Sequence, residues 1–91
     1  MYKLMKFKKT KKLAHRIIKG EAFVLDASSQ TLHSMNPSGT RIWELIDGSR
    51  TAGDIAQIIQ EEFEVESGTA IKDVLEFLCE LLEKGLVEKC I

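Results

Sequence analysis

The histidines and cysteines are the residues of this 91-residue chain best suited to bind a metal or to act as nucleophile and base. His15 and His33 fall on segments with a strand-like pattern, and Cys79 and Cys90 lie within or just after the last apolar helix. A zinc site needs ligands at close spacing, such as C-x-x-C, and these four residues show none. No histidine lies near either cysteine in sequence to activate it. We therefore expect no metal site; a disulfide is conceivable, but reduced thiols are the simpler expectation.

Other chemistry-bearing patterns are equally incomplete. Four glutamates crowd into residues 61–66, where a solvated helix end is the simplest explanation because Ca²⁺ binding needs a loop geometry that is missing. The glycines Gly39, Gly48 and Gly53 lie in or beside expected helices and form no G-x-x-x-x-G-K phosphate loop. The serines lack the strained turn between strand and helix that exposes a nucleophilic serine. We therefore expect a protein that is not an enzyme, with no catalytic residue and no cofactor.

Three short apolar segments precede the helices and predict a small antiparallel sheet. They cover Leu13–Lys19, Ala22–Ala27 and Thr31–Met35, with Gly20 in the first turn and the small polar residues 27–30 in the second. A sheet of this size must bury one face against helices to be stable.

Three helices follow, and their ends are marked in the sequence. Asn36 is a strong N-cap, Pro37 suits the first helical position, and Gly48 suits the left-handed position after the helix. A second helix is predicted from the N-cap Thr51, and a third that begins within Ser67–Thr69 and runs to Lys84. Because all strands precede all helices, we expect an α+β domain with a three-stranded antiparallel sheet followed by three helices.

The third helix is apolar over an unusually wide arc. At 100° per residue, its apolar side chains span roughly 200°, whereas one buried face needs about 100°. One edge of the arc holds Val74, Phe77 and Leu81, and the other holds Leu75 and Cys79. Two explanations fit this wide arc. The helix is central and packs on both the other helices and the sheet, or one edge of the arc lines a groove; both can hold at once.

The strand Thr31–Met35 has the character of an open sheet edge. It contains no proline, lysine or glutamate to block pairing with another strand. An exposed edge beside an apolar helix suits peptide capture by strand addition, in which main-chain bonds set the register and pockets select side chains. The sequence therefore favours binding over catalysis.

Charge is unevenly distributed along the chain. Residues 1–20 hold eight of the thirteen Lys and Arg residues and none of the fourteen Asp and Glu residues. We expect residues 1–12 to be a basic, partly disordered arm and residues 13–91 to be the folded domain. The arm is either a solvated tail or a patch that attracts an acidic partner. Few aromatics interleave with it, so we expect no nucleic acid, and without a membrane span or signal peptide we expect a cytoplasmic protein.

Several stretches in a fixed order resemble the PqqD family, proteins named for the biosynthesis of pyrroloquinoline quinone (PQQ). They are Phe23–Asp26, Thr31–Pro37, Arg41–Gly48, Asp54–Phe63 and Asp73–Val87. The resemblance covers about residues 13–88 and implies a three-stranded sheet followed by three helices, similar to a winged helix. The family is the prototype of the element that recognises precursor peptides in ribosomal peptide-modification pathways.

The resemblance also implies a mode of binding. In the family, the leader of a precursor peptide adds as a strand beside the third strand, in a groove bounded by the third helix. The loaded domain then presents the peptide to a modifying enzyme, often a radical S-adenosylmethionine (SAM) protein. The peptide-binding residues implied here are Thr31, Leu32, His33 and Ser34 on the strand and Val74, Phe77, Leu78 and Leu81 on the helix.

Our leading hypothesis is thus a non-catalytic adaptor that captures a precursor leader. The alternative is a winged-helix nucleic-acid binder that uses the basic arm, whose affinity would fall steeply with salt; a third is an interaction domain with another protein partner. The long basic arm is not expected of a minimal family member, and both PQQ and another peptide-derived compound stay open as the product. An open edge can also pair with a second copy, so we expect a monomer or weak dimer.

Overall fold

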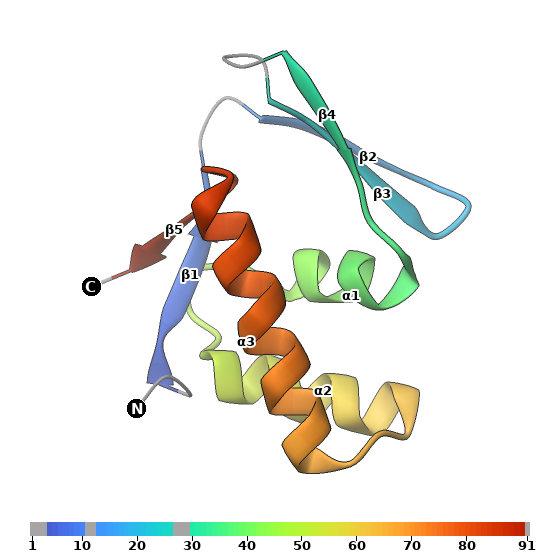
Figure 1. Cartoon of the computed structure of the whole chain (residues 1–91), viewed down its shortest axis with the longest axis vertical. Helices are drawn as coiled ribbons and strands as arrows, with labels where there is room; N and C mark the ends of the chain where they lie inside the picture. Colours follow the sequence, from blue (N-terminus) through green and yellow to red (C-terminus); the bar gives the residue numbers. More distant parts are fainter. Residues whose placement is uncertain (1–3, 11–12, 27–29, 91) are drawn as a thin grey trace.

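Residues 4–10, 13–26 and 30–90 are described by the structure, a computed structural model of the chain. A small sheet stands apart at one end, and α1, α2 and α3 pack together below it, with β1 and β5 alongside α3 (Figure 1). The elements in order are β1 (Lys6–Lys9), β2 (Leu13–Ile18), β3 (Glu21–Asp26), β4 (Thr31–Ser34), α1 (Pro37–Leu45), α2 (Ala52–Phe63), α3 (Ser67–Glu83) and β5 (Val87–Cys90).

The predicted three-stranded antiparallel sheet followed by three helices is confirmed. The strand order is β2-β3-β4, so β4 lies at one edge. Lys19 and Gly20 join β2 to β3 with φ angles of 51° and 80°, and positive φ at both turn positions matches the twist of a tight hairpin. The second predicted turn falls largely on residues 27–29, which lie outside the described residues.

Lys6–Lys9 lies within residues 1–12, which are expected to be a partly disordered arm, and it is a strand in the structure. This strand, β1, pairs antiparallel with β5 at Val87–Cys90. Phe7 provides the physical reason, because its side chain is only 3% exposed and joins the core, while neighbouring lysines point outward. Burial of this ring and the backbone pairing with β5 together anchor a lysine-rich segment that charge alone would leave in solvent. Residues 1–3 and 11–12 of the arm lie outside the described residues.

The helix starts follow the predicted caps. The Asn36 side chain accepts a hydrogen bond from the Gly39 N–H at 2.8 Å. Thr51 and Asp54 form a reciprocal capping box, with both hydrogen bonds at 3.0 Å. Gly48, with φ of +86°, lies in the loop after α1 and not directly at the helix end. These caps fix where α1 and α2 begin relative to the sheet.

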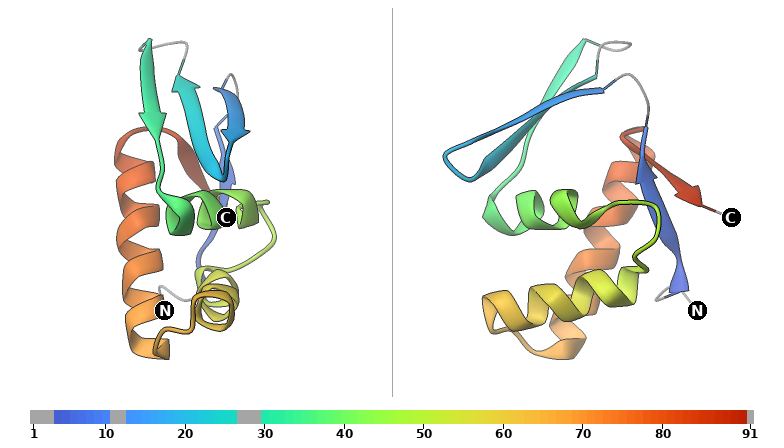
Figure 2. Two further views of the ribbon diagram at one scale, coloured as in Figure 1. Left: turned by 90° about the vertical axis from the view of Figure 1, so that its right-hand side faces the viewer. Right: turned by 180° about the vertical axis from the view of Figure 1, so that it is seen from behind.

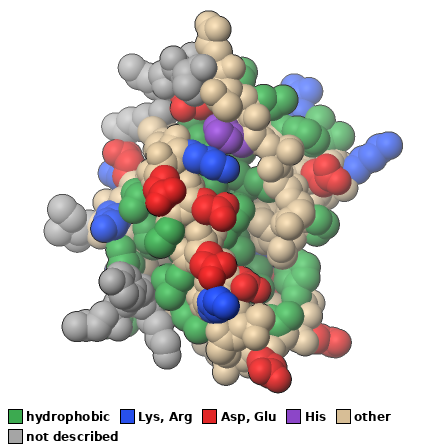
Figure 3. Space-filling model, in the orientation of Figure 1, with side chains coloured by type: hydrophobic (Ala, Val, Ile, Leu, Met, Phe, Trp, Pro, Cys, Tyr) green, Lys and Arg blue, Asp and Glu red, His purple; other side chains and the backbone are tan. Residues whose placement is uncertain are grey.

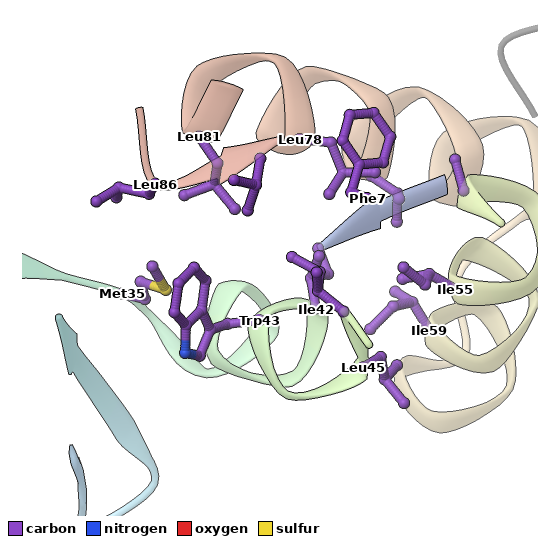
Figure 4. Packing of buried hydrophobic residues seen from close by; sticks show 14 of the residues in the cluster. Phe7, Met35, Ile42, Trp43, Leu45, Ile55, Ile59, Leu78, Leu81 and Leu86 are labelled. Atoms are coloured by element: carbon purple, nitrogen blue, oxygen red, sulfur yellow. The ribbon is translucent and has the colours of Figure 1, made fainter. Parts of the chain in front are cut away.

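The core lies between α3 and the other elements, and Trp43 joins its parts (Figure 4). The indole of Trp43 is 1% exposed. The Lys9 Nζ lies 5.0 Å from the centre of the indole, and the His15 ring meets it edge-on at 5.9 Å between ring centroids. Burial lowers the pKa of Lys9, and the nearby carboxylates of Glu44 and Asp47 oppose this shift. One α1 residue therefore contacts both β1 and β2.

Thr40 connects α1 to the end of the sheet. Its buried hydroxyl accepts a hydrogen bond from the Ala22 N–H at 2.8 Å and donates one to the Met35 carbonyl at 3.3 Å. The Met35 N–H in turn donates to the Ala22 carbonyl at 3.0 Å. The hydroxyl thus takes the place of one bond of the β3–β4 ladder and holds β4 in position over α1.

We predict that Thr40→Val destabilises the domain by about 1–3 kcal/mol, because it leaves the buried Ala22 N–H without an acceptor. Valine has nearly the same shape, so the loss reports the hydrogen bonds and not a cavity. Urea unfolding followed by the fluorescence of Trp43 measures the effect. Thr40→Ser, which keeps the hydroxyl, is the control and should retain most of the stability; equal losses in both variants would assign the effect to packing of the methyl group.

Candidate functional site

The free edge of the sheet is the β4 side that faces away from β3. Met35 and Ala22 are a hydrogen-bonded pair, and in an antiparallel ladder such pairs alternate with pairs that are not hydrogen-bonded. His33 is therefore the next β4 residue whose backbone bonds to β3. The N–H and C=O groups of Leu32 and Ser34 then point outward from the edge. These are the groups with which an added strand would pair.

The four predicted strand residues divide between the two faces of the sheet. The Leu32 side chain is 62% exposed. His33 lies on the same face as Met35, toward the helices, and is half-buried. Thr31 and Ser34 are exposed residues at the two ends of β4. The backbone groups that point away from the sheet are thus those of Leu32 and Ser34, while His33 bonds inward to β3.

Of the four predicted helix residues, only Phe77 is partly open to solvent. Val74 and Leu78 are 0% exposed and Leu81 is 3% exposed, so these three side chains form core and do not line a groove in this structure. Leu78 and Leu81 both point into the buried cluster (Figure 4). The reason is the central position of α3, which contacts α2 and β5 and buries the middle of its wide apolar arc. Phe77 lies at the edge of that arc.

A hollow of about 390 Å³ separates the end of β4, the start of α1 and the middle of α3. Its lining combines an apolar floor with polar rims: Ser34, Met35, Asn36, Ser38, Gly39, Ile42, Asp73, Phe77 and Glu80. Acidic side chains gather over α3 on the same face of the molecule as β4 (Figure 3). Asp73 and Glu80 are the site residues that the sequence analysis missed, although their spacing from Phe77 places all three on one face of a helix.

Gly39 allows the Phe77 ring to lie directly against α1. A Cβ added at Gly39 would stand 3.1 Å from the Phe77 Cζ and 3.1 Å from the Asn36 Oδ1. These contacts are tighter than ordinary van der Waals distances. A larger residue at this position would therefore push the ring outward into the hollow.

We predict that Gly39→Ala narrows the hollow without unfolding the domain. Alanine favours the helix by up to about 1 kcal/mol over glycine, which offsets the cost of shifting the tip of a flexible ring. The measurement pairs thermal unfolding with the side-chain NMR signals of Phe77. Gly68→Ala is the matched control, because a Cβ at Gly68 on α3 meets no atom within 4 Å. Unchanged Phe77 signals in Gly39→Ala would contradict the predicted contact.

A second hollow of about 560 Å³ lies on the other side of α3, against β1 and β5. It is larger and more apolar, and its lining includes Met5, Leu75, Leu82 and the exposed Cys79. The β4 edge does not border it. We therefore place the candidate site at the smaller hollow, where an unoccupied strand edge and an aromatic side chain meet.

Residues 4–10, 13–26 and 30–90 also bear on metal binding and on membrane insertion. No three His, Cys, Asp or Glu side chains in these ranges come close enough to hold a metal ion. No helix in the same ranges is both long and apolar enough to cross a bilayer.

A family model described as coenzyme PQQ synthesis protein D (PqqD) matches residues 21–87, which is most of the chain and includes β4 and α3. The chain belongs to the PqqD family. The resemblance seen in the sequence is thereby confirmed. No curated protein sequence matches this PqqD family member closely enough to serve as a relative.

Solved structures share the architecture over nearly the whole chain. TbiB1 in complex with the TbiA(beta) leader peptide is 27% identical, with a TM-score of 0.83 over 89% of this chain and 94% of that chain. A lasso peptide synthetase B1 complexed with the leader peptide is 22% identical, with a TM-score of 0.82 over 91% and 98% of the two chains.

A third structure is the PqqD truncation of Methylobacterium extorquens PqqCD, described as a functional, stand-alone RiPP recognition element, where RiPP denotes a ribosomally synthesised and post-translationally modified peptide. It is 19% identical, with a TM-score of 0.74 over 90% and 87% of the two chains. These likenesses cover a larger share of the chain than the family match over residues 21–87.

Proposed function

We propose that this PqqD family protein captures the leader of a ribosomally made precursor peptide by strand addition to β4 and presents it to a modifying enzyme. The observation that carries the proposal is the open β4 edge, with the outward backbone groups of Leu32 and Ser34, beside the hollow that Phe77 lines. Main-chain bonds to the edge would fix the register of the leader, and the hollow would select one of its side chains. TbiB1, similar in fold at 27% identity, is itself described in complex with a leader peptide.

In this role the protein makes no covalent change to the peptide. Binding orders the leader and raises the local concentration of the attached core peptide at the enzyme, which supplies the chemistry. We propose a radical SAM enzyme as that partner and PQQ or another peptide-derived compound as the product. The encounter would take place in the cytoplasm, where the precursor is synthesised.

The test uses short open reading frames that neighbour the gene, with the amino-terminal half of each product made as a synthetic peptide. Each peptide is titrated into the ¹⁵N-labelled full chain. Saturable amide shifts at Leu32, Ser34 and the residues around Phe77 are expected, and they should persist when salt rises from about 50 to 200 mM. Shifts that are confined to the lysines of β1 and disappear as salt rises would overturn the proposal. They would favour nucleic-acid binding by the basic arm, because binding to phosphates weakens steeply between these salt concentrations.

A further inference from the structure

We infer that the hollow beside β4 selects a leader segment in which an apolar side chain is flanked, two residues away on each side, by lysine or arginine. The inference rests on the proposed function and adds the chemistry of the peptide that the site accepts. It is carried by two carboxylates that flank Phe77 in the lining of the hollow, Asp73 and Glu80.

The spacing on α3 matches that of an extended peptide. Asp73, Phe77 and Glu80 stand four and three residues apart, which at 1.5 Å per residue places the carboxylates about 6 Å and 4.5 Å along the axis on either side of the ring. Side chains on one face of a strand repeat about every 6.8 Å. Two views show β4 and α3 extending in nearly the same direction in space (Figures 1 and 2). A strand paired with β4 would therefore run along α3. The carboxylates on the helix lie slightly closer to the ring than alternate strand residues lie to one another, and the long side chains of lysine or arginine accommodate this difference in spacing.

Neither carboxylate is neutralised within the part of the chain that the structure describes. Asp73 and Glu80 are exposed, and no described lysine or arginine forms an ion pair with either. The two described arginines that form ion pairs do so with other carboxylates: Arg41 with Glu62 at 2.8 Å and Arg50 with Asp47 at 2.9 Å.

The opposite wall of the hollow carries no counter-charge. Among the described residues it is formed by Ser34, Asn36 and Ser38, and the Ser38 hydroxyl donates to the Asn36 side chain at 3.1 Å. The lining thus has one acidic side, one neutral side and an apolar floor that includes Ile42. A peptide with a cation beside its apolar anchor complements all three, whereas an acidic peptide would place like charges together.

The expected size of the effect follows from exposure. Ion pairs at a solvated rim are individually weak, so each carboxylate should change peptide affinity by about twofold to fivefold. The two carboxylates together affect the choice of peptide more than either does alone, because each contacts a cation on a different side of the apolar anchor.

The test selects peptides from a random 12-residue display library on the full chain and on Asp73→Asn/Glu80→Gln. The wild-type chain should enrich peptides with an apolar residue and lysine or arginine at the second position on one or both sides. The double variant should keep the apolar preference and lose the basic one, and Asp73→Lys/Glu80→Lys should shift it toward aspartate and glutamate. Glu76→Gln is the matched control, since Glu76 lies on the same helix but lines only the hollow on the other side, whereas Glu80 borders both hollows.

Two results separate failure of this inference from failure of the proposed function. Peptides enriched with the same charge distribution by the wild-type chain and the double variant would overturn the charge selection and leave strand capture intact. A library that yields no peptide whose binding perturbs Leu32 and Ser34 amides would overturn the proposed function, and with it the selection inferred here.

Discussion

Replacing Leu32 with proline is expected to weaken leader binding at least tenfold while the domain stays folded. The Leu32 N–H points away from β3, so its loss removes no bond of the internal ladder, and proline is tolerated on edge strands in this orientation. The Leu32 side chain is 62% exposed, so its truncation removes little packing. A bound peptide would lose a main-chain donor and meet the proline ring where its own backbone should lie. The lost hydrogen bond and the clash together cost more than about 1.4 kcal/mol, which corresponds to a tenfold loss of affinity.

The neighbouring substitution His33→Pro is the matched control. It removes an N–H that bonds inward to β3 and should lower the free energy of unfolding by about 1–3 kcal/mol or more. Circular dichroism and unfolding separate the two variants, and peptide titration by calorimetry measures binding. A folded Leu32→Pro variant that binds like the wild-type chain would show that the leader does not pair with β4.

How much of this site the sequence could predict depends on which interactions define it. Asn36, Thr51 and the alternating apolar strands act over a few residues, so the sequence alone predicted the sheet, the helix starts and the edge position of Thr31–Met35. The wide apolar arc of α3 also indicated its central place. Its consequence for the site was underestimated, because a central helix buries Val74, Leu78 and Leu81 in core contacts with elements distant in sequence.

The other differences between the sequence-based expectation and the structure also come from contacts between residues distant in sequence. Strand β1 exists because Phe7 meets the core and β5 supplies its hydrogen-bond partner from the other end of the chain, a long-range pairing that no local pattern marks. The close approach of Gly39 to Phe77 is another such contact. Asp73 and Glu80 were accessible from sequence through their helical spacing around Phe77. Their role depends on the hollow, which only the folded arrangement of β4, α1 and α3 creates.

Phe77→Asp is expected to abolish leader binding and leave the domain folded, whereas Leu78→Asp is expected to unfold it. Phe77 is partly exposed at the hollow, and an aspartate there reaches solvent; it removes the apolar surface for the anchor and adds a third carboxylate between Asp73 and Glu80. Leu78 is 0% exposed, and an unpaired carboxylate in the core costs several kcal/mol, comparable to the whole stability of a small domain.

The two adjacent substitutions introduce the same side chain on the same helix, so they differ only in the environment that receives it. Far-UV circular dichroism and Trp43 fluorescence report folding, and titration with a selected peptide reports binding. If Phe77→Asp unfolds the domain as Leu78→Asp does, the Phe77 ring is core and the leader must be recognised by the β4 edge alone. If it folds and binds normally, the leader does not enter the hollow. Folding with loss of binding is the result that places the anchor of the peptide against Phe77.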